Sequence, residues 1–453
     1  MDDANRTRWI RVLRNLRPNQ PPPEGLYVEP RHGCAAAIVD DFLVDPVACR
    51  KFLLIGATGG GKSSELREIA RRLRDQATLV TIDLDASGIN ATSVSAFDLL
   101  YISAVQLLRM VPQKEAEPLF DKLRKRYAGD EAQELGDLKT AWGGLSQFAE
   151  AGGGVATAMG VAAAAAGVDL GDAATGTAAV LSLGGNLMGQ MGAGLRLRSQ
   201  SSGVVAETSP MGRSLQEVCV EIARACRKSN PLPLCVLIDG LEKMNGEAGE
   251  RFRQVFEQTR LLADTQWTAV IASPPCTLTE TNSAAGRGYL TRPVWGFGPD
   301  DFERLKTLLE RRLFEAEVDL ERDVEAGQLF RIAEQSGGLP RLAVQIAYES
   351  VKTALLSKSP TLTAAHTDAG IQTIAQQLGL GLNAEHLRIL SAVRARGLLP
   401  EAEKAATLFA DGRILAHPPV PPSPMPRFVV HPLLAGDVAL FDQRNTLERL
   451  PGA

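Results

Sequence analysis

Residues 51–66, KFLLIGATGGGKSSEL, contain the strongest structural signal in the sequence. The first five of them form an apolar run typical of a buried strand, and the residues after Lys62 have the spacing of an amphipathic helix. The eight residues between strand and helix, Gly56 to Ser63, fit the pattern GxxxxGK[ST] without a mismatch. In such a turn the backbone N–H groups face phosphate oxygens, and the helix N-terminus adds its positive dipole end. The sequence therefore predicts a phosphate-binding loop.

This loop predicts ATP and Mg²⁺ as the ligands. Lys62 is expected to bridge the β- and γ-phosphates, and Ser63 to place its hydroxyl on Mg²⁺. The residues expected to contact the nucleotide are Gly56, Ala57, Thr58, Gly59, Gly60, Gly61, Lys62, Ser63 and Ser64.

Further apolar runs predict the remaining strands of a parallel sheet. They lie at 77–84, 234–238 and 267–272, with a weaker one at 290–297, and helical patterns separate them. Continuous apolar strands that alternate with helices indicate a sheet covered on both faces. We therefore expect an α/β fold of the P-loop NTPase kind.

The run LCVLID, residues 234–239, predicts the second metal contact. Its apolar residues deliver Asp239 to the carboxyl edge of the sheet, where α/β folds bind ligands. Asp239 is expected to hold Mg²⁺ through water. Glu242 follows three residues later and is a candidate for polarising the attacking water, although an acidic residue after a strand is also common on protein surfaces.

The chain divides into four predicted parts. Residues 1–24 form a basic amphipathic arm, which either packs on its own domain or docks to an acidic partner. The NTPase core spans 25–298 and includes a low-complexity Gly/Ala-rich insertion at about 115–205. A helical lid follows at 299–380 and a winged-helix-like domain at 381–453. The uncharged part of the insertion is too short for a confident membrane span, although a membrane-active hairpin stays an alternative.

Composition narrows the class of protein. The chain has 453 residues, a net charge of -4 and six cysteines. The near balance of charge argues against a surface that is basic throughout and binds nucleic acid over its whole extent. The absence of a CxxC pair or a Cys/His cluster argues against a zinc site. The N-terminus has charges where a secretory signal has an apolar segment, so we expect a cytoplasmic protein.

The segments GATGGGKSSEL, LIDGLEKM and SGGLPRLAV together resemble bacterial P-loop ATPases of the AAA+/STAND group. The resemblance implies a P-loop core, a helical lid and a winged helix. It also implies that Ser273 is the polar "sensor 1" and Arg341 the lid "sensor 2", and that residues 27–31 lie beside the adenine. An arginine finger acting on a neighbouring subunit would be Arg287, with Arg292 as the other candidate, and homo-oligomers are implied.

One departure from the AAA+ pattern concerns hydrolysis. AAA+ enzymes have Glu directly after the Walker B Asp, whereas Gly240 follows Asp239 here. The sequence therefore favours slow or switch-like turnover. The leading hypothesis is an ATPase switch that acts on a protein effector, with a bacterial defence or signalling role implied by the resemblance. The alternatives are a DNA-associated loader or transposition-type ATPase, and a nucleotide-dependent scaffold without hydrolysis.

The winged-helix-like domain gives an ambiguous signal for nucleic acid. Its presumptive recognition segment, 401–412, carries three acids against the single Lys404, which disfavours phosphate contact. Arg388, Arg394 and Arg396 on the preceding helix keep a DNA contact open. His417 and His431 are expected to pack in or lie on the hairpin rather than bind metal.

Overall fold

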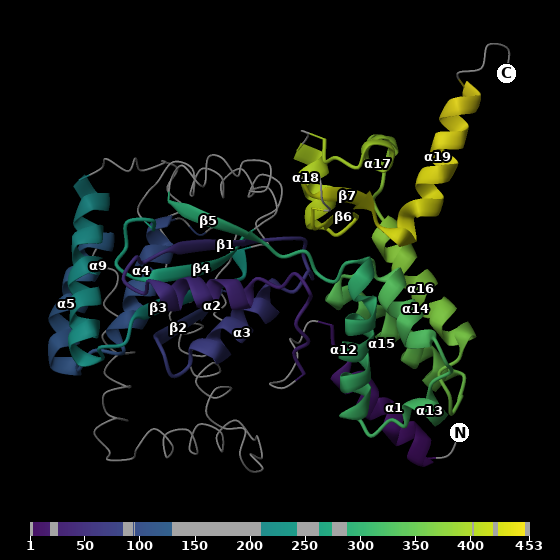
Figure 1. The fold of residues 1–453 in the computed structure, drawn as a ribbon, viewed down its shortest axis with the longest axis horizontal. Helices are drawn as coiled ribbons and strands as arrows, with labels where there is room; N and C mark the ends of the chain where they lie inside the picture. The colour runs from purple at the N-terminus through teal and green to yellow at the C-terminus, as the bar shows by residue number, and fades with distance from the viewer. Residues whose placement is uncertain are drawn as a thin grey trace.

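The computed structural model describes residues 3–18, 26–84, 94, 96–128, 210–241, 262–273, 288–400, 403–419 and 425–448. Figure 1 shows two halves side by side, an α/β half built on a sheet and a helical half that carries the C-terminal domain. Among the described residues no helix is both long and apolar enough to cross a membrane.

The core is a parallel sheet of five strands in the order β2-β3-β4-β1-β5. The strands are β1 (Lys51–Ile55), β2 (Thr78–Asp83), β3 (Leu234–Asp239), β4 (Thr268–Ser273) and β5 (Tyr289–Pro293). The residues of β1 and β4 are buried throughout, as continuous apolar runs require in a sheet covered on both faces. The predicted parallel α/β sheet is confirmed, and the weak fifth run forms the short edge strand β5.

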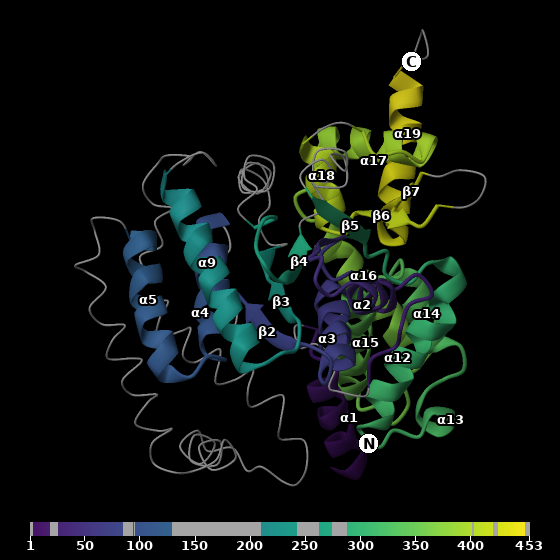
Figure 2. The same ribbon diagram turned by 60° about the vertical axis from the view of Figure 1, so that its left-hand side comes forward.

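Two helical layers cover the sheet, as Figure 2 shows with the sheet between them. On one face lie α2 (Ala35–Val44) and α3 (Lys62–Leu73), packed on the alternate strand residues that include Leu54 and Leu237. On the other face lie α4 (Ala96–Leu108), α5 (Gln113–Ala128) and α9 (Pro210–Ser229), packed on residues such as Ile238. Alternation along each strand thus sends neighbouring side chains into two separate cores.

Helix α5 changes the boundary predicted for the Gly/Ala-rich insertion. Residues 113–128 form this helix, and it packs on α9 because Leu123 and Phe120 join the hydrophobic core there. This part of the range 115–205 therefore belongs to the core. The Gly/Ala-rich residues themselves lie outside the described residues.

The lid consists of α12 (Phe302–Phe314), α13 (Leu320–Asp323), α14 (Gln328–Gln335), α15 (Pro340–Leu356) and α16 (Ala364–Gly379), after the short 3-10 helix η6 (Pro299–Asp301). The N-terminal helix α1 (Asp3–Asn15) packs on this lid. Trp9 is fully buried and donates from Nε1 to the carbonyl of Ser359 at 3.2 Å, and Arg8 pairs with the buried Asp323 at 2.6 Å. The apolar stripe of the arm thus completes the core of the lid.

The C-terminal domain contains α17 (Ala384–Arg396), α18 (Glu403–Ala410), the antiparallel strands β6 (Ile414–His417) and β7 (Arg427–Val430), the 3-10 helix η7 (Pro432–Leu434) and α19 (Ala435–Glu448). Two helices followed by a hairpin agree with the predicted winged-helix-like module. The structure adds α19, which the sequence patterns did not predict. One hydrophobic cluster, with Leu339 from the lid and Leu415 from β6, runs through both lid and C-terminal domain.

Candidate nucleotide site

The predicted phosphate loop connects the end of β1 to the start of α3. Gly59 and Gly61 have φ angles of 80° and 107°, in the left-handed region that favours glycine. A Cβ on Gly59 would lie 2.7 Å from Cβ of Arg341, whereas a Cβ on Gly61 would meet nothing within 4 Å. The loop therefore needs glycine at 59 for a close approach of the lid, and it leaves open space beside Gly61, at the start of α3.

Lys62 is turned into the loop. Its side chain is 3% exposed, and Nζ donates to the carbonyl oxygens of Gly56 at 2.8 Å and Ala57 at 3.0 Å. The ammonium is thus held inside the turn that its own motif forms, where phosphate oxygens could replace these two carbonyls as its partners. Ser63 and Ser64 follow it, half-buried, in the first turn of α3.

The carboxyl edge of the sheet brings the other predicted residues beside this loop. Ser273, buried at the end of β4, lies in register with Ile55, the residue before the loop. Asp239 ends β3, the next strand beyond β4, and its Oδ1 accepts the N–H of Gly240 at 3.0 Å. The predicted sensor and metal-side residues therefore end adjacent strands next to the phosphate loop. Glu242 and Arg287 lie outside the described residues.

The lid reaches the phosphate loop through the turn that precedes α15. The N–H of Arg341 points to the carbonyl of Gly59 at 3.4 Å. Gly338 has a φ of 81°, and a Cβ there would lie 1.6 Å from the carbonyl oxygen of Phe297, so only glycine fits. The predicted sensor 2 residue is thus brought against the loop. Arg292, the second finger candidate, pairs within its own chain with Asp41 at 2.6 Å.

The C-terminal domain also contacts the phosphate loop, which the sequence did not predict. The N–H of Thr58 donates to the carbonyl of Ala410, the last residue of α18, at 2.9 Å. His431 is fully buried beneath the lid turn and lies 3.0 Å from the carbonyl of Ser336. A backbone-to-backbone contact of this kind leaves no signal in the residue types.

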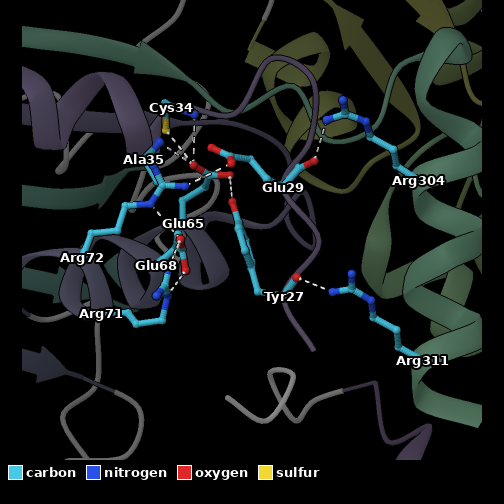
Figure 3. Close-up of polar contacts among 10 residues, drawn as sticks. All are labelled: Tyr27, Glu29, Cys34, Ala35, Glu65, Glu68, Arg71, Arg72, Arg304 and Arg311. Carbon is cyan, nitrogen blue, oxygen red and sulfur yellow. Dashed lines mark hydrogen bonds and ion pairs between the residues drawn. The ribbon is translucent and has the colours of Figure 1, made fainter. Parts of the chain in front are cut away.

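The segment expected to lie beside the adenine runs between α3 and α12 (Figure 3). Glu65 of α3 accepts the hydroxyl of Tyr27 at 2.9 Å, and its other oxygen accepts the N–H groups of Cys34 and Ala35 at the start of α2. Burial, reinforced by the charge of Glu65, raises the pKa values of the Tyr27 hydroxyl and the Cys34 thiol. Both groups therefore stay neutral donors to a buried carboxylate.

The lid holds the other side of this segment. Arg311 of α12 donates to the carbonyl of Tyr27 at 3.0 Å, and Arg304 donates to the carbonyl of Glu29 at the same distance. The N–H of Arg31 donates to Asp301 at 2.7 Å. The segment is thus hydrogen-bonded to the helix of the phosphate loop on one side and to the lid on the other.

No protein-family model matches this sequence, and no curated protein is significantly similar to it. Solved structures match over nearly the whole chain. The ORC2 protein of Aeropyrum pernix in its ADP form has a TM-score of 0.41 and 13% identity, covering 96% of this chain and 98% of its own. Drosophila ORC bound to DNA has a TM-score of 0.38 and 10% identity, covering 98% and 93%. The ORC1 protein of A. pernix in complex with DNA has a TM-score of 0.38 and 10% identity, covering 97% and 98%. Likenesses at this level do not place the chain in a family.

Proposed function

We propose that this protein is an ATP-binding P-loop ATPase of the AAA+ type, in which the lid and the C-terminal domain respond to the nucleotide. The observation that carries the proposal is the phosphate loop itself, with Lys62 held inside it and both the lid turn and α18 hydrogen-bonded to its backbone. Any ligand that reorganises the loop acts directly on these two contacts. The arrangement therefore favours a switch.

The residues at the site fit Mg²⁺-ATP. A glycine turn, a helix N-terminus and a lysine ammonium provide donors for phosphate oxygens, and hydroxyl and carboxylate oxygens are the ligands that Mg²⁺ prefers. Ser63 would hold the ion directly and Asp239 through water, while Arg341 would contact the phosphates from the lid. The bound ion would supply charge neutralisation for phosphoryl transfer. Glu242 stays a candidate for orienting the water.

The proposal is tested by replacing Lys62 with Ala. The variant should lose Mg²⁺-ATP binding or turnover and keep its thermal unfolding midpoint, because water can reach the carbonyls of Gly56 and Ala57 once the side chain is shortened. The matched control is Lys358→Ala, a lysine on the lid surface. Binding measured by calorimetry and turnover measured by phosphate release should fall in the first variant alone. Equal rates in Lys62→Ala and the parent would remove the site assignment.

The partner of this switch is a protein effector in our proposal, and homo-oligomers are expected if an arginine from a neighbouring subunit completes the site. Helix α18 has the position of the recognition helix in a winged helix, and its residues favour a protein partner over DNA. In α18 the side chains of Leu408 and Phe409 are buried, and Lys404 is paired with Glu385 of α17. The role in bacterial defence or signalling rests on the sequence resemblance alone.

A DNA-associated ATPase is the second candidate. Arg388, Arg394 and Arg396 on α17 are all exposed. Exposed arginines on one helix are suited to phosphate contacts, since each neutralised phosphate releases counterions. This candidate uses the same nucleotide site and differs only in what the C-terminal domain binds.

A further inference from the structure

The carboxyl edge of the sheet holds a second aspartate, which no sequence motif marks. Asp83 is the last residue of β2, and it lies in parallel register with Asp239, the last residue of β3. The pairing continues past the strand end, where the N–H of Leu84 donates to the carbonyl of Asp239 at 3.2 Å. The two carboxylates therefore leave the sheet at the same height from neighbouring strands.

Alternation places both carboxylates on the face of the phosphate-loop helix. Cys235 and Leu237 of β3 pack into the core beneath α2 and α3, together with Leu79 of β2. Val80 and Ile238 pack on the opposite face. Because side chains alternate, Asp83 and Asp239 continue the first series and lie on the side of α3, the helix that begins with Lys62.

The electrostatics of Arg67 on α3 agree with this placement. Desolvation lowers the pKa of its guanidinium, and the charges of Asp239 and Asp83 act in the opposite direction. The charges of both carboxylates thus act on a side chain of the phosphate-loop helix, as expected if both lie on its face of the sheet. The two acids therefore belong to one electrostatic environment with α3.

We propose that Asp83 is the carboxylate that orients and deprotonates the attacking water, in place of the glutamate that AAA+ sequences carry directly after the Walker B aspartate. The inference rests on the proposed ATPase function. It follows from the glycine at 240, which provides no side chain, and from the in-register carboxylate that β2 brings to the same edge. The division of labour is then one carboxylate for the ion, Asp239, and one for the water, Asp83.

The proposed step is the hydrolysis of ATP. The water oxygen forms a bond to the γ-phosphorus while its proton passes to the Asp83 carboxylate. The bond from the γ-phosphorus to the bridging oxygen breaks, and its electron pair leaves on ADP. The proton then passes from Asp83 to solvent, so that the products are ADP, inorganic phosphate and one proton.

The test compares Asp83→Asn, Asp83→Glu and Glu242→Gln in the full chain, with Asp75→Asn, an exposed aspartate just after α3, as the matched control. Asp83→Asn should lower kcat by about 100-fold, since a positioned base typically contributes 10²–10⁴-fold. The Kd for Mg²⁺-ATP should stay within about threefold, because the carboxylate serves the water and not the phosphates. Asp83→Glu should recover part of kcat and thereby separate a chemical role from a structural one.

Each other outcome counts against the inference. A loss of kcat under about tenfold in Asp83→Asn overturns the inference. So does a Kd for Mg²⁺-ATP that rises by the same factor as kcat falls. If Glu242→Gln abolishes turnover and Asp83→Asn does not, Glu242 is the residue that orients the water. If Asp83→Asn does not fold, Asp83→Ser takes its place, and a loss of kcat under about tenfold in that variant overturns the proposal. A parent that binds ATP without turnover above the Lys62→Ala background overturns this inference alone, whereas a parent that does not bind ATP overturns the proposed function as well.

Discussion

At the scale of single residues, the site depends on where charge is held before any ligand arrives. Lys62 is bonded to the carbonyls of Gly56 and Ala57, and Asp239 accepts the N–H of Gly240. These contacts keep each charged group in place at the loop and at the sheet edge. Nucleotide binding would then exchange one set of partners for another with little reorganisation.

Asp239 gives the prediction at this scale. Asp239→Asn should lower Mg²⁺-dependent turnover by roughly 100-fold, since a metal ion supplies several kcal/mol of charge stabilisation to such a transition state. ATP binding measured without Mg²⁺ should change little, because the carboxylate acts on the ion. Calorimetry with and without Mg²⁺, beside phosphate release, separates the two effects. A variant that loses ATP affinity equally in both conditions contradicts the metal-side role of Asp239.

At the scale of elements, the lid turn and the C-terminal hairpin are joined through one buried histidine. The carbonyl of Ser336 lies 3.0 Å from Nε2 of His431, and the N–H of Leu433 donates to Nδ1 at 3.2 Å. A carbonyl only accepts, so Nε2 carries the proton and Nδ1 accepts, which is the neutral form. Burial lowers the pKa of His431 to about 4. A second proton would sit on Nδ1 and point at the N–H of Leu433, so that two donors would face each other.

The expected pH dependence follows from this shift. The unfolded chain takes up a proton near pH 6.5, whereas the folded chain takes it up only near pH 4. The unfolded state therefore binds more protons between these values, and the free energy of unfolding should fall by up to roughly 3 kcal/mol as pH drops through this window. Urea unfolding at pH 7 and pH 4.5 measures the slope.

Two variants make that measurement specific to His431. His431→Gln should flatten the slope, because glutamine does not titrate, although it should also lower stability at pH 7 by loosening the contact with the lid turn. His32→Gln, at an exposed position before α2, is the control and should keep the parent slope. An unchanged slope in His431→Gln would show that other groups dominate acid destabilisation.

At the scale of the whole molecule, the N-terminal helix packs on the lid and the C-terminal domain contacts the phosphate loop. Helix α1 completes the core of the lid, and α18 touches the loop through Ala410 (Figure 1). The C-terminal domain is therefore held on the candidate nucleotide site by the loop contact and by the core that it shares with the lid. What that domain binds decides between the two candidate functions.

A salt titration of DNA binding by the full chain tests the partner. We expect weak binding, because α18 is largely buried and α17 pairs Arg394 with Asp442 at 3.7 Å. Changing Arg394 and Arg396 to Ala together should then alter the affinity by less than about threefold. Tight binding with a steep salt slope that the double variant abolishes would instead establish the DNA-associated candidate. Lys125→Ala and Arg126→Ala together, at exposed positions on α5, provide the charge-matched control.

Features that depend on local patterns could be predicted from the residues alone. Apolar runs predicted the parallel strands because burial on both faces requires them, and GATGGGKS predicted the loop because only glycines permit its turn next to a helix start. Asp239 and Arg341 could be proposed as site residues because each follows a recognisable local pattern, and their roles stay predictions. Helix α19 was missed because its apolar residues form only a weak amphipathic pattern.

The contacts between groups far apart in the chain depend on how the elements pack. The register of β2 with β3 sets Asp83 beside Asp239, although about 150 residues separate them in the chain. Other contacts likewise join segments that share no motif. Helix α1 is buried in the lid, Thr58 donates to the carbonyl of Ala410, and the Tyr27 hydroxyl donates to Glu65. Backbone carbonyls and N–H groups are present at every position, so their pairing leaves no mark on residue identity. It is fixed by how the packed elements fill space, which the linear pattern does not contain.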